Sequence, residues 1–325
     1  MYKLHFNSIL SSKNIFSNVC ISPKATYIIT LLLVMILSLP SCKKNVQSAG
    51  PKYGDEPAEK LISRYHFAIH PLHNPVMLMR AYQPLLDYLE KNMKGVHFNL
   101  ETSTDYADFE MKYKKRIPAF ILPNPWQTLQ AIQSGYNVIA TAGDATDFKG
   151  LIIVRKDANI KIPSDLKGKS VSYPSQTALA ACIMPQYFLY QHGVDVNKDI
   201  ENHYVGSQES SIMNVFLKMT AASATWPAPW RSFKKRYPKE AAELIVKWET
   251  EPLINNSVMV RNDVPKEVWK PVQKHLVHLN GTLEGKEILS TMEISRFIIA
   301  TNNDYYIVQN YVDKFERDVR KIDQK

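Results

Sequence analysis

Hydroxyl side chains cluster in the segment SYPSQTALAAC, residues 172–182. Ser172, Tyr173, Ser175 and Thr177 lead directly into an alanine-rich helical pattern that carries no charge. The first backbone N–H groups of a helix lack partners and carry positive potential, which an acidic residue commonly balances. No carboxylate follows here, so two interpretations remain. Either the hydroxyls cap the helix, or the helix start is kept for an anion that binds and leaves.

Three tryptophans lie near the ends of expected strands. Trp126 belongs to the run PNPW, and Trp226 and Trp230 bound the run WPAPW. Ligands of an open α/β sheet bind beyond the carboxyl ends of its strands, so these loop tryptophans are candidates for lining a cleft. Burial between loops is the alternative.

Histidine spacing raises the question of a metal site. His66, His70 and His73 are separated by four and three residues, which would suit one face of a helix. Two of them, however, fall in an expected strand that is followed by Pro71, with no acidic or cysteine ligand nearby. We therefore expect neither a metal nor a cofactor.

The elements that must position these residues alternate along the chain. A first series is followed after Gly150 by a second, in the rhythm of a parallel α/β sheet. The expected strands are 65–70, 96–101, 118–122, 137–142, 169–173, 202–205 and 221–226. The expected helices are 75–93, 105–114, 125–134, 176–192, 207–219, 266–279 and 303–322.

A sequence echo divides the chain into lobes. The strands LIIVRKD at 151–157 and SVMVRND at 257–263 share the ending Val-Arg-x-Asp and bracket the second series. Such a pair indicates two chain crossings between lobes, although two strands could share this ending by chance. We expect residues 61–150 plus 258–325 to form lobe 1 and residues 151–257 to form lobe 2, with the C-terminal helices packing back on lobe 1.

The beginning of the chain has the features of a leader. A basic, acid-free stretch precedes the apolar run 27–39, which is short for a membrane span and typical of a signal-peptide core. The run ends in Leu39-Pro40-Ser41-Cys42, which resembles a bacterial lipoprotein signal. We expect residues 1–41 to be a signal peptide, Cys42 to carry the lipid, and residues 42–60 to be a tether. An uncleaved anchor or plain secretion is the alternative.

Charge and cysteine content limit the function classes. The leader holds three lysines, so the net charge falls from +9 to +6 without it, and no Lys/Arg block of a nucleic-acid arm is present. A modest basic excess suits an anion or an anionic surface. If Cys42 is lipidated, Cys182 has no partner, and its place on an apolar helix face predicts a buried, inert thiol.

Several collinear motifs carry a family resemblance. The runs PLHNPVMLMRAYQPLLDYL, LIIVRKDANI and DLKGKSVSYPSQTA resemble the phosphate, phosphite and phosphonate substrate-binding proteins of ABC importers. So do the steps Thr104-Asp105-Tyr106, Val205-Gly206-Ser207 and Ala224-Thr225-Trp226, in the same order from 65 to 304. The resemblance implies the α/β fold class of a type II periplasmic binding protein, with two α/β lobes joined by two hinge crossings and closing over a small ligand.

The resemblance also implies ligand contacts. The hydroxyl turn of the family matches Ser175, Gln176 and Thr177, and a family tyrosine matches Tyr106. The turn at Ser207 and Gln208 starts another helix toward the cleft, where the family often has histidine. Phe148 and Lys149 lie near a further tyrosine contact. Asn256 stands where aminophosphonate binders carry an acid, which argues against aminoalkylphosphonates as ligands.

The expected function is an extracytoplasmic solute-binding lipoprotein, anchored through Cys42, that delivers a small phosphorus oxyanion to an ABC permease. We expect a monomer with no nucleic-acid partner. One alternative is a component that presents the ligand to a sensor. Another is an enzyme resembling the pyrimidine synthases of the same fold. The absence of P-loop, GxSxG, HExxH and paired zinc-type cysteine motifs weakens the enzyme alternative.

Overall fold

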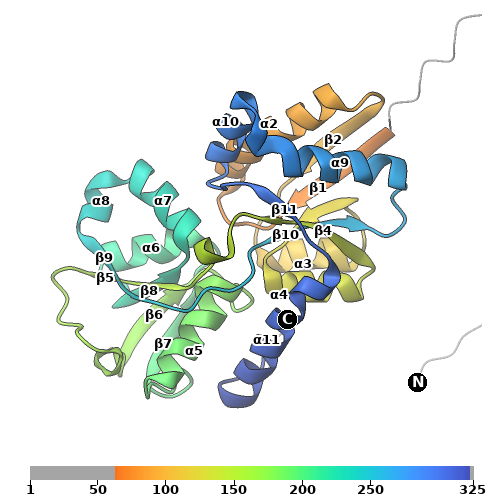
Figure 1. The fold of residues 1–325 in the computed structure, drawn as a ribbon. Helices are drawn as coiled ribbons and strands as arrows, with labels where there is room; N and C mark the ends of the chain where they lie inside the picture. The colour runs from red at the N-terminus through yellow and green to blue at the C-terminus, as the bar shows by residue number, and fades with distance from the viewer. Residues whose placement is uncertain (1–62, 323–325) are drawn as a thin grey trace, which may run out of the picture. The chain divides into compact units, whose positions relative to one another are not determined.

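The computed structural model describes residues 63–322, all of which fall within one compact unit spanning Ala58–Lys325. The predicted leader, Cys42 and the tether lie outside the described residues. Two β-sheets, each flanked by helices, make up the described chain (Figure 1).

The first sheet has six strands in the order β11-β4-β10-β3-β1-β2. Strands β1 and β2 pair in parallel, with Phe67 opposite Leu100, and β3 continues the parallel set beside β1. The strands are β1 Ser63–Ile69, β2 Val96–Glu101, β3 Phe120–Leu122, β4 Tyr136–Ala142, β10 Ser257–Arg261 and β11 Phe297–Ile299. The associated helices are α2 Pro75–Asn92, α3 Tyr106–Lys114, α4 Pro125–Gln133, α9 Lys266–His278, α10 Leu283–Thr291 and α11 Tyr306–Asp318.

The second sheet has five strands in the order β7-β6-β8-β5-β9. Its strands are β5 Leu151–Arg155, β6 Lys169–Tyr173, β7 Ile200–Tyr204, β8 Ala222–Thr225 and β9 Leu244–Glu249. Its helices are the π-helical turn η3 Leu179–Ile183, α5 Met184–Gln191, α6 Gln208–Phe216, α7 Pro227–Arg236 and α8 Pro238–Ala242. Short 3-10 turns are η1 Ala145–Asp147, η2 Pro163–Leu166, η4 Leu279–Gly281 and η5 Asn302–Tyr305.

Both sheets are mixed, whereas the sequence predicted parallel ones. In the first sheet β10 runs antiparallel to β3 and β4, and β11 runs antiparallel to β4. In the second sheet β5 runs antiparallel to β8 and β9. The alternating pattern identifies the parallel βαβ units correctly, but β5 and β10, which follow the two crossings, and the edge strand β11 run in the opposite direction.

The Val-Arg-x-Asp echo corresponds to a structural repetition. Strands β5 and β10 hold the same place in their sheets, each inserted antiparallel beside β8 or β3. Arg155 Nε donates to Asp157 at 2.8 Å, and Arg261 Nε donates to Asp263 at 2.6 Å. Each arginine also donates from Nη1 to a backbone carbonyl at the end of a helix. For Arg155 this is the carbonyl of Phe216 at 2.8 Å, and for Arg261 it is that of Arg116 at 2.6 Å.

The sequence predicts that the chain returns to lobe 1 at residue 258. In the structure Ser257 is already paired in the first sheet, one residue earlier. The C-terminal helix α11 contacts α4 of the first lobe, as expected. It also reaches the second lobe, where Tyr311 and Phe315 pack against Tyr187 of α5. One cluster of buried apolar side chains therefore extends from the first lobe into the second.

Elements between 227 and 249 were missing from the sequence-based prediction. The sequence predicts a loop for the run Pro227-Ala-Pro-Trp230, but this run forms the first turn of α7. Proline is tolerated there because the first backbone N–H groups of a helix have no intrahelical acceptor. The same reason places Pro125 and Trp126 in the first turn of α4. Helices α8 and α10 and strands β9 and β11 were also not predicted.

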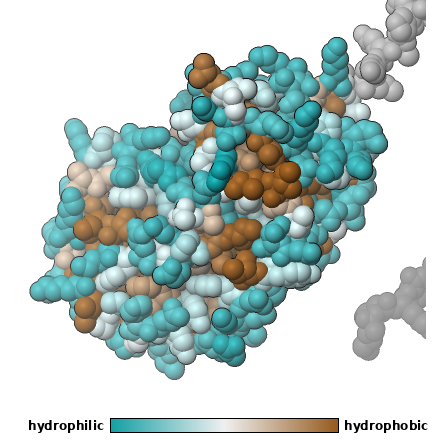
Figure 2. Space-filling view, viewed as in Figure 1, coloured by the Kyte–Doolittle hydropathy of each residue, from teal (hydrophilic) through white to brown (hydrophobic). Residues whose placement is uncertain are grey.

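No helix within residues 63–322 is long and apolar enough to cross a membrane. The face shown in Figure 2 is largely hydrophilic, with apolar side chains gathered over the region of β11. Ile298 and Ile299 of that edge strand are 38% and 62% exposed.

Candidate functional site

Two topologically equivalent helices begin at facing positions in the two lobes. Helix α3 follows β2 and starts at Tyr106, and α6 follows β7 and starts at Gln208. Gln208 Nε2 donates to the Tyr106 phenol oxygen at 3.2 Å, which joins the lobes directly. Thr225 Oγ1 donates to Gln208 Oε1 at 2.8 Å and fixes the amide orientation. The phenol oxygen of Tyr106 therefore accepts from Gln208, and its own proton is available to another acceptor.

Burial keeps Tyr106 in its neutral, donating form. The side chain is 4% exposed, and desolvation raises the pKa of its phenol well above the usual value. The hydrogen bond from Gln208 opposes this shift only in part. At any ordinary pH, Tyr106 can donate a hydrogen bond to an anion.

A small enclosed cavity lies where these side chains meet. Its volume is about 10 Å³, which is close to the space that one water molecule requires. One wall is aromatic, because the Phe148 and Trp226 rings pack 5.5 Å apart. The lining residues are His70, Tyr106, Asn124, Phe148, Ala178, Leu179, Ala180, Ala181, Gln208, Trp226 and Asn256.

Asn256 supplies an uncommitted polar group to this cavity. Its side chain is 3% exposed, and Oδ1 has no hydrogen-bond partner in the described chain. A buried carboxamide oxygen without a partner is costly, which is typical of a group that meets its partner only when a ligand is bound.

His70 is a cavity residue that sequence reasoning had considered only as a metal ligand. Its Nδ1 lies 2.9 Å from the Leu122 carbonyl, and its ring is 6.2 Å from that of Tyr106. Burial lowers the pKa of His70 to about 4 despite the hydrogen bond to Leu122, so the imidazole is neutral at pH 7. His66 instead pairs with Glu101. No group of three or more His, Cys, Asp or Glu side chains within 63–322 is arranged to hold a metal.

The hydroxyl turn 174–177 lies beside this cavity and does not cap the helix that follows. The N-cap of η3 is Ala178, which makes no side-chain capping bond. Ser175 Oγ instead accepts from the Thr177 backbone N at 3.3 Å, and Thr177 Oγ1 donates to Glu110 at 2.7 Å. Across the lobes, Asn124 Nδ2 donates to the Thr177 carbonyl at 3.1 Å.

A wider pocket of about 250 Å³ opens next to this turn. It shares Tyr106 with the enclosed cavity, so the two spaces meet at that side chain. Its lining residues are Asp105, Tyr106, Ala107, Glu110, Pro174, Ser175, Gln176, Thr177, Tyr204 and Gly206. A larger groove of about 660 Å³ lies at the opposite end of the second sheet, around Lys169 and Lys218, and shares no residue with either space.

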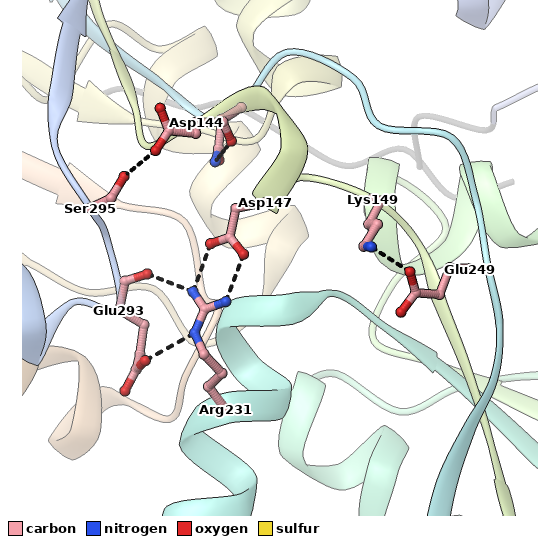
Figure 3. Close-up of polar contacts among 8 residues, drawn as sticks. Asp144, Asp147, Lys149, Arg231, Glu249, Glu293 and Ser295 are labelled. Atoms are coloured by element: carbon pink, nitrogen blue, oxygen red, sulfur yellow. Dashed lines mark hydrogen bonds and ion pairs between the residues drawn. The ribbon is translucent and has the colours of Figure 1, made fainter.

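Two chain crossings, residues 143–150 and 250–256, connect the lobes and bond to each other. Gly150 N donates to Thr250 Oγ1 at 2.8 Å, and Thr250 N donates back to the Gly150 carbonyl at 2.9 Å. Lys149 forms an ion pair with Glu249 beside these bonds (Figure 3). Lys149 is therefore engaged at the crossing and is not among the residues that line the cavity.

An arginine clasp spans the same region. Arg231 of α7 points between Asp147 of η1 and Glu293 of the first lobe (Figure 3). Its guanidinium donates to both Asp147 oxygens at 2.6 and 2.7 Å, to Glu293 Oε2 at 3.1 Å and to the Glu293 carbonyl at 2.9 Å. Bidentate pairing of this kind is geometrically specific, so the clasp ties the second lobe to the crossing and to the first lobe.

The structure brings together most of the candidate residues. Tyr106, Gln208, Trp226 and Asn256 line the enclosed cavity, and Ser175, Gln176 and Thr177 line the adjoining pocket. Ser207 caps α6 through Ser210 N at 3.1 Å and lines neither space.

Trp126 and Trp230 differ from expectation. Trp126 is 1% exposed and belongs to the buried core that extends across both lobes, and Trp230 stacks on Phe233 in a separate core of the second lobe. Trp126 belongs to the helix that the sequence predicts over 125–134, whereas Trp230 belongs to α7, which the sequence does not predict. Neither lines the cavity.

Cys182 is buried and forms no disulfide, as predicted. Desolvation raises the pKa of its thiol to about 12, so it is not a nucleophile at ordinary pH. The sequence did not identify His70 as a cavity residue, and it did not identify Asn124, Glu110 or residues 178–181. Asn124 could have been noticed, because it precedes a proline-started helix at a strand end.

A protein-family model matches most of this chain. Residues 67–305 match the model described as "ABC transporter, phosphonate, periplasmic substrate-binding protein". The chain belongs to this family. It is also 26% identical over 193 residues to the probable ABC transporter phosphite binding protein PhnD1 of Prochlorococcus marinus (strain MIT 9301), a match that covers 55% of this chain and 65% of that relative.

Solved structures share the two-lobed fold of this family member. PhnD1 from Prochlorococcus marinus in complex with methylphosphonate gives a TM-score of 0.72 at 19% identity, over 78% of this chain and 99% of that one. A binding protein component of an ABC phosphonate transporter from Pseudomonas aeruginosa gives 0.72 at 16% identity, over 78% and 87%. These similarities confirm the predicted two-lobed α/β architecture.

Proposed function

We propose that this family member is an extracytoplasmic solute-binding protein that holds a small phosphorus oxyanion between its lobes and delivers it to an ABC permease. The observation that supports this most is the convergence of Tyr106 and Gln208, which lie at equivalent helix starts of opposite lobes, on one enclosed polar cavity. The relative PhnD1 was solved with methylphosphonate, which makes that compound the natural first probe.

Neutral donors are sufficient for such a ligand. Each hydrogen bond to a charged group contributes about 1.5–3 kcal/mol. Five or six of them, from the phenol, the amides and the backbone near 178–181, offset an association cost of about 4–15 kcal/mol and leave micromolar affinity. A lysine or arginine in the cavity is not required.

Binding requires the lobes to separate and close again. A cavity of about 10 Å³ is smaller than any phosphorus oxyanion, and Gln208 and Tyr106 bond to each other across it. The ligand must therefore part these two side chains. The crossings 143–150 and 250–256 are where the chain can bend to allow this, since they alone connect the two sheets through the backbone.

A thermal-shift and calorimetry panel tests the assignment on residues 43–325. Phosphate, phosphite, methylphosphonate, aminoethylphosphonate, sulfate and a thiamin-like pyrimidine are compared. A true ligand at one hundred times its dissociation constant stabilises the fold by about 2.7 kcal/mol, which is readily measured. We expect a response to an unaminated phosphorus oxyanion. A response to the pyrimidine alone, or to none of the anions, would contradict the proposal.

We further infer that Cys42 is the lipid attachment site that holds the protein at the membrane. The supporting observation is the apolar run 27–39 followed by Leu39-Pro40-Ser41-Cys42. Metabolic labelling with a radioactive fatty acid should mark the wild-type protein in a bacterial host, and Cys42→Ala should abolish the label. Equal labelling of both proteins would exclude this site.

A further inference from the structure

A buried carboxylate accepts a hydrogen bond from the hydroxyl turn. Glu110 of α3 is 5% exposed, and its Oε1 accepts from Thr177 Oγ1 at 2.7 Å and from Gln127 Nε2 at 3.2 Å. Both of these donors are neutral. Thr177 belongs to the second lobe and Glu110 to the first, so this bond also crosses the lobe boundary.

The hydroxyl of Thr177 can satisfy only one anion. A threonine hydroxyl has a single proton to donate, and that proton is directed to Glu110. Ser175 Oγ lies 3.1 Å from Thr177 Oγ1 and accepts from the Thr177 backbone N, so the whole turn is organised around the carboxylate. An oxyanion that accepts a hydrogen bond from the Thr177 hydroxyl must therefore replace Glu110 as the acceptor of that hydrogen bond.

We propose that Glu110 is a resident anion of the cleft that competes with the ligand for the Thr177 hydroxyl and thereby weakens the closed complex. This inference rests on the proposed function. It gives Glu110 the role of an affinity-setting residue, which keeps binding in a range from which the ligand can be released.

The surroundings of Glu110 strengthen the competition. The pocket beside the turn is lined by two carboxylates, Asp105 and Glu110, and by no lysine or arginine. Repulsion between Glu110 and an incoming anion is therefore not offset by a cation in the pocket wall. Burial raises the pKa of Glu110, and the bonds from Thr177 and Gln127 and the charge of Lys114 oppose this rise only in part. Repulsion also grows with ligand charge, so a dianion is penalised more than a monoanion.

The test is Glu110→Gln, which keeps the shape of the side chain and removes its charge. Calorimetric titration with methylphosphonate is done at about pH 8, where a phosphonate carries two charges. We expect the variant to bind about tenfold tighter than the wild type, which corresponds to about 1.4 kcal/mol. Hypophosphite, a phosphorus oxyanion with one charge, should gain less from the same substitution.

Glu287→Gln is the matched control, because Glu287 is exposed on α10 and the same charge is removed away from the cleft. Its affinity should stay within about twofold of the wild type. Glu110→Ala is a second variant, and it should also bind methylphosphonate more tightly than the wild type. It provides the test if Glu110→Gln fails to fold. Thermal unfolding verifies that each variant is native.

The outcomes separate the two proposals. If wild type binds methylphosphonate and both Glu110 variants bind it equally or more weakly, the competition is wrong and the proposed function stands. If neither the wild type nor any variant binds any of the phosphorus oxyanions, the proposed function is wrong, and this inference falls with it.

Discussion

Tyr106 and Gln208 show how two ordinary side chains become a site. Each occupies the first position of a helix that follows the second parallel strand of its sheet, so the two are topological equivalents. Their hydrogen bond of 3.2 Å places a phenol donor and an amide donor together in a space from which water is largely excluded. Hydrogen bonds in such a setting are stronger than in water, which is what recognition of an anion by neutral groups needs.

Tyr106→Phe should weaken methylphosphonate binding by about 10- to 150-fold, because one hydrogen bond to a charged group is lost. Titration calorimetry measures this directly. Tyr136→Phe is the control. Tyr136 is a buried tyrosine of the same lobe whose phenol donates to the Pro118 carbonyl at 2.7 Å, and it does not line the cavity. That variant should lose stability but not affinity, and a similar loss of affinity in both variants would contradict the role of Tyr106.

His70 makes folding stability depend on pH. Its pKa is about 4 in the folded chain and 6.5 in an unfolded one, because burial disfavours the imidazolium. A lowered pKa contributes stability that is complete above pH 6.5 and is lost as the pH falls toward 4. Between pH 7 and pH 5 the loss due to His70 should be about 2 kcal/mol.

Urea unfolding of the wild type and His70→Gln at the two pH values measures this contribution. Glutamine can still donate to the Leu122 carbonyl, and the variant should lose about 2 kcal/mol less than the wild type between pH 7 and pH 5. The comparison removes other titrating groups, such as His73, whose pKa is also lowered by burial. The same pH dependence in both proteins would show that His70 is not buried as neutral imidazole.

At the scale of elements, the crossing at Gly150 packs tightly on the helix behind the cavity. A Cβ at this position would lie 2.9 Å from the Ala180 carbonyl oxygen and 2.9 Å from Pro185 Cδ. Real Cβ atoms do not approach this closely, so the close approach requires glycine. The small side chains of Ala178, Ala180 and Ala181 allow the π-helical turn η3 to pack against both the crossing and the cavity.

Gly150→Ala should therefore destabilise the fold by about 1–3 kcal/mol, the usual cost of overpacking. The free energy of unfolding in urea measures it. Gly281→Ala is the control, since a Cβ there meets nothing within 4 Å. Its effect should stay within about 0.5 kcal/mol. Equal stability of the Gly150 variant and the wild type would show that the crossing can shift without cost.

At the scale of the whole molecule, closure rests on contacts between lobes that are far apart in sequence. Beside the Tyr106–Gln208 and Glu110–Thr177 bonds, the Arg231 clasp joins α7 to Asp147 and Glu293. Surface ion pairs individually contribute little, but a bidentate arginine held in a network of two carboxylates contributes more. The clasp must break when the lobes separate, so it favours the closed form.

Arg231→Ala should weaken ligand binding by about 3- to 10-fold, mainly through faster dissociation. The reason is that the closed form, which is the form that holds the ligand, loses a contact that stabilises it. Stopped-flow tryptophan fluorescence measures the rate. Arg236→Ala is the matched control on the same helix, because Arg236 pairs at 2.8 Å with Glu209 within one lobe. That variant should bind normally, and equal effects of the two substitutions would show that charge alone, rather than the clasp, matters.

The sequence by itself determined the parallel βαβ units, most helix starts, the two crossings and the buried thiol of Cys182. These depend on hydrophobic periodicity and on local capping, which act over a few residues. The collinear motifs also pointed to Tyr106, Thr177 and Gln208, because their resemblance to the family implies ligand contacts at these positions. The antiparallel insertion of β5 and β10 and the helix of Trp230 were not predicted from the sequence. A proline-containing run can be a loop or the first turn of a helix, and a strand can pair in either direction. Tertiary packing decides between these alternatives.

Only the tertiary structure decided which group each donor meets. Ser175 and Thr177 were expected either to cap a helix or to wait for an anion, and Thr177 instead donates to Glu110, which lies 67 residues away. His70, Asn124 and Asn256 reach the same cavity from three separate strand ends and crossings. Local sequence sets the type and limits of an element, whereas partners across a lobe boundary follow from long-range packing, which no short stretch of residues encodes.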